Sequence, residues 1–104
     1  MIYEARGLIG LAQRAGRCVS GAELAERALR EGTAKLILLD EAASGHTVDH
    51  FRSIADGVNV PFLFVPNLGE MIGKEGRRVC AVNDEGFARA ILKKTGETAI
   101  NPGV

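Results

Sequence analysis

The sequence has little of what marks secreted, disulfide-bonded or membrane-spanning proteins. It contains no tryptophan and only two cysteines, and no apolar run reaches the length needed to cross a membrane. Cys18 and Cys80 have no CxxC partner, so we interpret them as reduced, buried thiols, with a disulfide between them as the lesser alternative. The N-terminus lacks a signal-peptide pattern. We therefore expect a globular protein that resides in the cytoplasm and contacts no membrane.

An excess of charge of either sign is also missing. The 13 lysines and arginines balance the 13 aspartates and glutamates. This balance argues against general attraction to nucleic acid, because basic proteins gain affinity by releasing counterions. The cations are nevertheless clustered in residues 14–17, 27–35 and 74–78, whereas residues 40–59 are mainly acidic. A local basic face on a neutral protein is therefore compatible with the sequence.

Motifs of catalytic and nucleotide-binding sites are absent from the sequence as well. It has no GxxxxGK[ST] phosphate loop and no GxSxG elbow, and the glycines after residue 68 fit no nucleotide fingerprint. His46 and His50 are spaced as metal ligands on a helix would be, but the glutamate of a zincin motif is missing beside His46. We interpret these histidines as part of a solvated polar face. We expect no enzyme activity, no metal and no cofactor.

What is present is an alternation of helical and strand patterns. Helices are predicted over 3–15, 20–31, 47–55, 67–72 and 84–92, and strands over 18–19, 35–40, 60–65 and 78–82. Because helices separate the long strands, we expect a single α/β domain over residues 1–95, folded as a three-layer α/β/α sandwich with a short, mostly parallel central sheet. Residues 96–104 have little to bury and are predicted to form a flexible tail.

Two of these helices begin with the pattern of a capping box. Ser20 stands three residues before Glu23, and Asn67 stands three residues before Glu70. In a capping box each of the two side chains satisfies a backbone N–H at the start of the helix. We expect the second helix to present Leu24 on its inner face.

Three stretches of the sequence together resemble one protein family. They are LIGLAQRAGRCVSG at residues 8–21, Lys74-Glu75, and VNDEGFA at residues 82–88. In this order they resemble the kink-turn-binding ribosomal protein family, which includes archaeal and eukaryotic ribosomal and small nucleolar particle proteins. The fit is closest to its short bacterial branch, the YlxQ-like proteins. The resemblance covers residues 8–92 and implies an RNA-binding α/β/α domain.

The first RNA-gripping segment implied by this resemblance is a helix N-terminus. The family motif reads Gly-x-Asn-Glu-x-x-Lys, and the matching positions here hold Gly21, Glu23, Leu24 and Arg27. Glu23 and Leu24 replace residues that read sheared G·A pairs, whereas the glycine and the cation are kept. Free N–H groups at such a helix end suit a phosphate. The candidate contact residues are Gly21, Ala22, Glu23, Arg27 and Arg30. Alternatively, both arginines only pair with glutamates four residues earlier.

The second implied segment is the loop that follows the short helix. The family has Leu-Gly-x-x-x-Gly and then a mainly apolar loop that covers a flipped-out base, and Leu68, Gly69 and Gly73 match this pattern. The loop of this sequence is basic instead, which favours phosphate contact or stacking by guanidinium groups, unless it is only a solvated turn. The candidate residues are Gly73, Lys74, Glu75, Arg77 and Arg78.

The sequence therefore predicts an RNA-binding protein that recognises kink-turn-like structured RNA, ribosomal or regulatory, by shape and phosphate contacts. Binding would stabilise the bent form of the RNA. We expect a monomer that binds ribosomal RNA first of all, with ribosomal or translation-factor proteins as further partners. The alternative is a protein-interaction or ribosome-assembly factor that kept the fold but has weak RNA affinity. The neutral net charge, Glu23, Leu24 and Glu70 favour that alternative.

Overall fold

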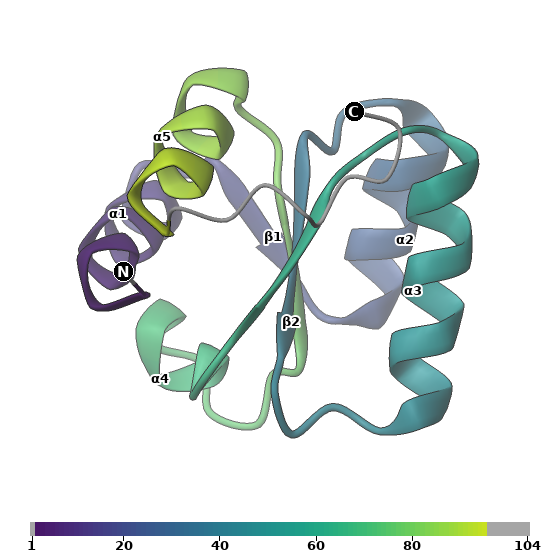
Figure 1. The fold of residues 1–104 in the computed structure, drawn as a ribbon, viewed down its shortest axis with the longest axis horizontal. Coiled ribbons are helices and arrows are strands. Elements are labelled where there is room, and N and C mark those ends of the chain that lie inside the picture. The colour runs from purple at the N-terminus through teal and green to yellow at the C-terminus, as the bar shows by residue number, and fades with distance from the viewer. Residues whose placement is uncertain (1, 96–104) are drawn as a thin grey trace.

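The computed structural model describes residues 2–95, and one four-stranded sheet between two layers of helices forms its centre (Figure 1). The elements in chain order are α1 (Ile2–Arg14), β1 (Cys18–Ser20), α2 (Ala22–Glu31), β2 (Leu36–Asp40), α3 (Gly45–Gly57), β3 (Phe62–Val65), α4 (Leu68–Ile72), β4 (Val79–Val82) and α5 (Glu85–Thr95). Each predicted helix and strand is found, with ends shifted by a few residues. The predicted tail at 96–104 lies outside the described residues. None of the described helices is both long and apolar enough to cross a membrane.

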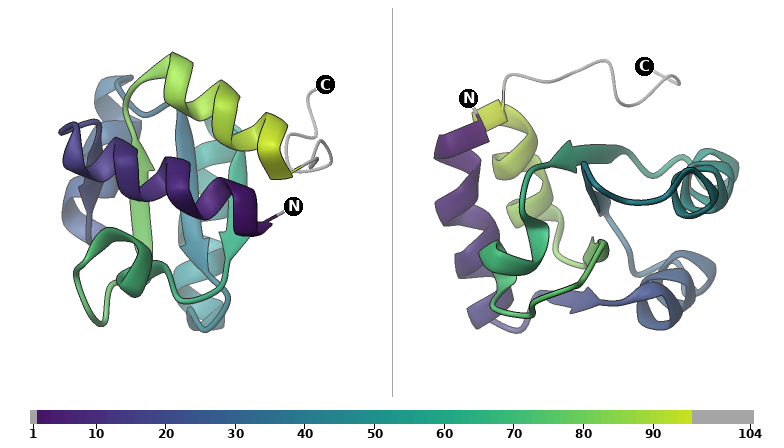
Figure 2. Two further views of the ribbon diagram at one scale, coloured as in Figure 1. Left: turned by 90° about the vertical axis from the view of Figure 1, so that its left-hand side faces the viewer. Right: turned by 90° about the horizontal axis from the view of Figure 1, so that it is seen from below.

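The two helical layers lie on opposite faces of the sheet, which confirms the predicted three-layer sandwich. Figure 2 shows α1, α4 and α5 on one face and α2 and α3 on the other. Strand β2 lies between two separate core clusters, because Leu36 and Leu38 enter the cluster under α1 and α5, whereas Ile37 and Leu39 enter the cluster under α2 and α3. All residues of β2 are buried, as its nearly continuous apolar sequence predicts for a strand covered on both faces.

The sheet is mixed, and the prediction of mostly parallel pairing is wrong. The strand order is β1-β4-β2-β3. Only β2 and β3 run parallel, whereas β4 runs antiparallel to both β1 and β2. The reason is the short helix α4: at a rise of about 1.5 Å per residue it is too short to carry the chain back to the far end of the sheet. The chain therefore enters β4 near the end where β2 and β3 finish.

The predicted capping box at Ser20 is not formed. Ser20 is the last residue of β1, is buried, and pairs with Cys80 across the sheet. Gly21 is the N-cap of α2 instead, and no side chain caps this helix end. Because β1 extends through Ser20, this residue lies one position before the N-cap and its hydroxyl does not cap the helix.

The predicted capping box at Asn67 is not formed either. Asn67 is the N-cap of α4, but it has φ 54° and its side chain makes no cap hydrogen bond. The Leu68 N–H donates instead to Oδ1 of Asp40, at 2.8 Å. Glu70 forms an ion pair with Arg6 of α1, so its carboxylate is directed to the neighbouring helix and not to its own N-terminus.

The two cysteines behave as the sequence predicts for reduced thiols. Cys18 and Cys80 are both free and both buried in the core cluster under α1 and α5. They lie on the neighbouring strands β1 and β4, and the Cys80 thiol donates to the carbonyl oxygen of Ala81 at 3.9 Å. They act as small apolar core residues.

Candidate functional site

The two predicted RNA-gripping segments meet at the N-terminus of α2. A Cβ built on Gly21 would lie 2.6 Å from Nη1 of Arg77 and 3.5 Å from its Cζ, so the guanidinium group covers the glycine directly. Gly21 also has φ 95°, a conformation that residues with a Cβ rarely adopt. The backbone conformation requires glycine at this position, whereas the guanidinium, at the end of a flexible side chain, would only have to move aside for a Cβ. Sequence reasoning predicted both segments as parts of one site but not this contact.

The N-terminus of α2 leaves backbone N–H groups without a side-chain cap. The N–H of Gly21, however, has a partner. The Gly21 N–H donates to the carbonyl oxygen of Val79, at 2.9 Å, so it is not free. The amides of Ala22 and Glu23 belong to the first turn, which no side chain caps. Together with the guanidinium of Arg77 they form a local positive end suited to an anionic group.

The loop over residues 73–78 is packed tightly against the start of α4. A Cβ on Gly69 would lie 2.7 Å from the carbonyl oxygen of Lys74 and 3.1 Å from the amide nitrogen of Gly76. The Lys74 N–H donates to the Gly69 carbonyl at 2.8 Å, and the Arg77 N–H donates to the Lys74 carbonyl at 3.2 Å. Gly73 ends α4 with φ 71°. These contacts give the loop a defined shape, which places Arg77 over α2.

Beside this loop the surface is hollowed. The hollow has a volume of about 500 Å³ and combines backbone, acidic and basic groups. It is lined by Asn67, Gly69, Glu70, Gly73, Glu75, Gly76 and Arg78. Three of the predicted loop residues, Gly73, Glu75 and Arg78, therefore line a part of the surface that Arg77 does not.

The loop cations differ in their ion pairing. Nη1 of Arg78 lies 3.6 Å from Oδ2 of Asp40, so its charge is partly balanced, although half of the side chain is exposed. Within residues 5–95, Arg77 and Lys74 have no carboxylate within ion-pair distance. Their positive charge is therefore directed to solvent or to a ligand.

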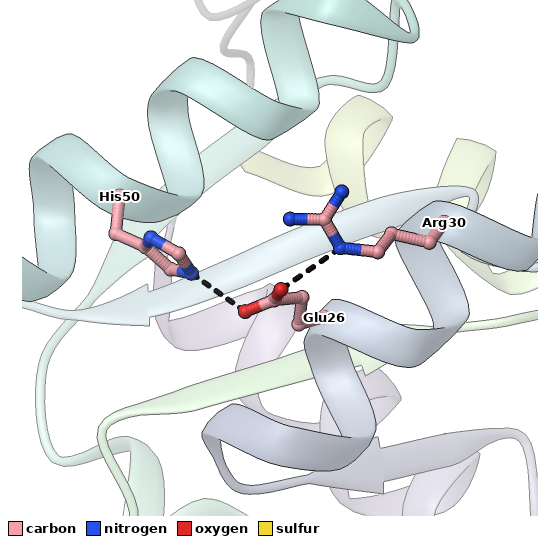
Figure 3. A network of polar contacts seen from close by, with 3 residues as sticks. All are labelled: Glu26, Arg30 and His50. Carbon is pink, nitrogen blue, oxygen red and sulfur yellow. Dashed lines mark hydrogen bonds and ion pairs between the residues drawn. The ribbon is translucent and has the colours of Figure 1, made fainter.

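The outer face of α2 holds the other predicted cations. Arg27 lies 3.8 Å from Glu23, and both side chains are mostly exposed, so this pair is loose. Arg30 donates through Nε to Glu26 at 2.8 Å, and the second oxygen of Glu26 lies 2.6 Å from Nε2 of His50 on α3 (Figure 3). The hydrogen bond with His50, followed by that from Arg30, lowers the pKa of Glu26. Arg30 is therefore held by a glutamate four residues earlier, as the alternative interpretation expected. Arg27 remains available to a ligand.

Leu24 is on the outside of α2, and its predicted place in the core is wrong. Its exposed fraction is 44%, whereas Ala25, Ala28 and Leu29 form the buried stripe of the helix. Consecutive residues of a helix differ by about 100° in direction, so Leu24 cannot share the side of Ala25 completely. An apolar side chain is therefore exposed within the first turn of α2, close to Gly21.

The two histidines of α3 lie on its outer side. Their rings are stacked with centroids 6.5 Å apart, and His50 contacts Glu26. Among the residues that the structure describes, no group of three or more His, Cys, Asp or Glu side chains is placed to hold a metal ion.

Sequence reasoning missed Asp40 as part of the site. It ends β2, and its side chain is only 3% exposed. A single acidic residue at the end of an otherwise apolar buried strand was the available signal, because buried carboxylates need several hydrogen-bond donors.

Comparison with known proteins places this geometry in a family. A sequence model described as the ribosomal protein L7Ae/L30e/S12e/Gadd45 family matches residues 4–92. The chain belongs to this family. The matched range contains all of α2, the 73–78 loop and the strands that hold them, so both halves of the candidate site are family regions.

Two curated relatives have the same printed name. The chain is 42% identical to the RNA-binding protein YlxQ of Bacillus subtilis (strain 168) over 88 residues, which cover 82% of this chain and 88% of that protein. It is 35% identical to the RNA-binding protein YlxQ of Enterococcus faecium over 97 residues, which cover 90% and 89% of the two chains. These relatives confirm the predicted YlxQ-like branch of the family.

Solved structures agree on the fold. A Bacillus halodurans protein, described as of unknown function, superposes with a TM-score of 0.85 and 31% identity, over 90% of this chain and 98% of that one. A 15.5 kD RNA-binding protein of Giardia lamblia superposes with a TM-score of 0.77, over 90% and 86% of the two chains. Its identity is 19%, so it supports the fold alone.

Proposed function

We propose that the protein binds structured RNA through the surface formed by residues 21–27 and 73–78, here called the α2–loop surface, and that it recognises kink-turn-like RNA. The position of the Arg77 guanidinium over Gly21 carries this proposal, because it joins two segments far apart in sequence into one cationic surface. The two curated relatives are named RNA-binding proteins, and the family description includes ribosomal proteins.

The chemistry of the surface favours recognition by shape and phosphate contact. Arg77 and Lys74 offer cationic donors, Arg27 is held only loosely, and the amides of Ala22 and Glu23 are uncapped. Such groups bind phosphate oxygens and fix the orientation of an RNA without reading its sequence. We propose that this surface makes more contacts with bent RNA than with straight RNA, so that binding would shift the RNA toward its bent form.

The hollow beside the loop has a role in the same proposal. Its volume of about 500 Å³ leaves room for one nucleobase turned out of the stack. Single-stranded bases in RNA are commonly held by stacking on aromatic rings or on guanidinium planes, and Arg78 at the rim of the hollow supplies such a plane. In the family the loop that covers the turned-out base is mainly apolar. Here the guanidinium of Arg78 would cover the base by stacking on it.

The proposal extends to the setting in which the protein acts. We propose a monomeric, non-catalytic binding protein of the cytoplasm, whose first partner is ribosomal RNA, or else a regulatory RNA, with ribosomal or translation-factor proteins as neighbours. Two free, buried thiols on adjacent strands fit a reducing compartment.

A second candidate function has one specific observation in its favour. Leu24 exposes an apolar side chain in the first turn of α2, and the neighbouring Glu23 side chain is 87% exposed. An acidic and an apolar residue at this point suit a protein partner better than a phosphate backbone. The second candidate is therefore a ribosome-assembly or protein-interaction factor with weak RNA affinity.

A mobility-shift titration separates the two candidates. The probe is a kink-turn duplex with tandem sheared G·A pairs, and its control has Watson–Crick pairs in their place, both measured at two salt concentrations. Sub-micromolar binding that requires the G·A pairs and weakens with salt supports the proposed function. Weak binding that is equal for both duplexes would reject kink-turn recognition and favour the assembly-factor role.

A further inference from the structure

Asp40 is the most deeply buried charged residue among the described residues, and its carboxylate has three partners. Oδ1 accepts the N–H of Leu68 at 2.8 Å, and Oδ2 accepts the N–H of Ala42 at 2.8 Å. Oδ2 also lies 3.6 Å from Nη1 of Arg78. Such a carboxylate is held in one orientation, because moving it would leave the buried Leu68 N–H without an acceptor.

The partners of Asp40 mark the two ends of one functional segment. Leu68 is the first residue of α4, and Arg78 is the last residue before β4. Between them lie α4 and the whole 73–78 loop. The backbone adds a further connection, because the Asp40 N–H donates to the carbonyl oxygen of Arg78 at 2.8 Å. A single residue at the end of β2 therefore fixes the point where this segment leaves the sheet and the point where it returns.

The segment passes this constraint on to the α2–loop surface. Gly69 packs against the backbone of Lys74, Gly76 and Arg77, with no space for a Cβ. The guanidinium of Arg77 lies over Gly21 in turn. A shift at either end of the segment would therefore move Arg77 relative to the N-terminus of α2.

We infer that Asp40 is a positioning residue of the RNA site: by holding both ends of residues 68–78 it sets the place of Arg77 over α2. This inference rests on the proposed function. It also gives Arg78 a second role, because a guanidinium that pairs with Asp40 stabilises the loop before any RNA is bound. Nothing in this role requires Asp40 to touch the ligand, which its burial prevents.

The inference and simple electrostatics predict opposite results for Asp40→Asn. Removing a carboxylate near a phosphate-binding surface should strengthen RNA binding if charge alone matters. If Asp40 is a positioning residue, the variant should bind the G·A duplex about fivefold more weakly, because an asparagine offers one acceptor and turns a donor toward a second backbone N–H. Tighter or unchanged binding would overturn the inference.

A double-mutant cycle shows whether the effect passes through Arg77. Asp40→Asn should weaken binding in the wild-type background but have little further effect in an Arg77→Ala background. Equal losses in both backgrounds would mean that Asp40 acts independently of Arg77, which would overturn the inference. The matched control is Asp84→Asn, because Oδ2 of Asp84 similarly accepts the N–H of Phe87 at 2.8 Å, at the start of α5. This control should keep the wild-type affinity.

Amide hydrogen exchange tests the inference without RNA. In Asp40→Asn the amides of Leu68, Lys74 and Arg77 should exchange faster than in the wild type, whereas Asp84→Asn should leave them unchanged. If Asp40→Asn unfolds, Arg78→Gln takes its place, because it removes the ion pair and leaves the two amide hydrogen bonds. Unchanged exchange at these amides in the folded variant would overturn the inference. If the wild type fails to bind the G·A duplex, the proposed function fails, and exchange alone decides the role of Asp40.

Discussion

The guanidinium of Arg77 lies over the Cα of Gly21, in the place that any side chain at position 21 would need. Replacing this glycine by alanine should therefore strain the backbone, which has φ 95°, and displace the flexible end of Arg77. We expect Gly21→Ala to lower the free energy of unfolding by about 1–3 kcal/mol, because a non-glycine residue is forced into a sparsely populated conformation. Denaturant unfolding measures this change, and RNA affinity should fall with it.

The control for that variant is Gly7→Ala. Gly7 is an exposed residue inside α1, and a Cβ there would meet nothing within 4 Å. Alanine should stabilise this helix by about 0.5–1 kcal/mol, because glycine is a poor helix former. A Gly21→Ala protein as stable as the wild type would contradict the assigned geometry of the α2 N-terminus.

The charge of Arg77 should matter to RNA binding beyond its contribution to net charge. We expect Arg77→Ala to weaken binding about tenfold and to reduce the slope of log affinity against log salt by about one, because one phosphate contact is lost. Arg89→Ala removes the same charge from an exposed position on α5, where the arginine pairs with Glu85, and should change affinity little. Equal effects of the two variants would show that only overall charge matters.

The contact between Glu26 and His50 links α2 to α3 and should make stability depend on pH. Hydrogen bonds from His50 and Arg30 lower the pKa of Glu26 in the folded protein. A carboxyl group with a lowered pKa in the folded state contributes stability above its pKa in the unfolded chain, and this contribution is lost as the pH falls through its folded pKa. The wild type should therefore be more stable than Glu26→Gln near neutral pH, and the difference should disappear in acid.

Unfolding curves for the two proteins over a series of pH values measure this difference. Glu31→Gln serves as the control, since Glu31 lies on the same helix and has no ion pair within the part of the chain that the structure describes. A Glu26→Gln difference that stays constant down to acid pH would contradict the assigned contact.

The two thiols should resist modification in the folded protein. Interaction with the Cys18 thiol, together with burial, raises the pKa of Cys80 above the usual thiol range, and the thiolate is the reactive form. The same interaction lowers the pKa of Cys18, so the protection of Cys18 rests on its burial in the core. We expect labelling by a thiol-specific disulfide reagent to be slow under native conditions and to reach both cysteines only in denaturant. Rapid labelling of the native protein would show that strands β1 and β4 open more easily than the packing implies.

Much of the fold could be predicted because local pattern and tertiary environment agree in most elements. The apolar run at 36–40 has a place in two core clusters, and Gly32 and Asp84 end or start helices by local chemistry. The direction of β4 could not be predicted in this way, because it depends on how far the short helix α4 carries the chain. That distance follows from packing, and no residue type signals it.

The candidate site shows the same division. The residues of the two segments could be predicted from the family resemblance, but their contact could not. Gly21 and Arg77 are far apart in the sequence, and only the fold brings them together. Ser20 and Leu24 were misplaced for a common reason. Ser20 suits the N-cap position, but Gly21 occupies it, and Leu24 suits the core, but Ala25 occupies the buried side of the helix. Asp40 supplies the cap expected of Asn67, which only the fold can show.

Energy transfer within a doubly labelled RNA shows whether the protein binds and bends kink-turn RNA. A kink-turn duplex with one dye at each end brings the dyes closer when it bends, so bending can be followed in a low-magnesium buffer in which the free RNA is mostly extended. We expect the wild-type protein to increase transfer with sub-micromolar affinity and Arg77→Ala to need about tenfold more protein. No increase in transfer with the wild type, or an equal increase with the Watson–Crick control duplex, would contradict this expectation.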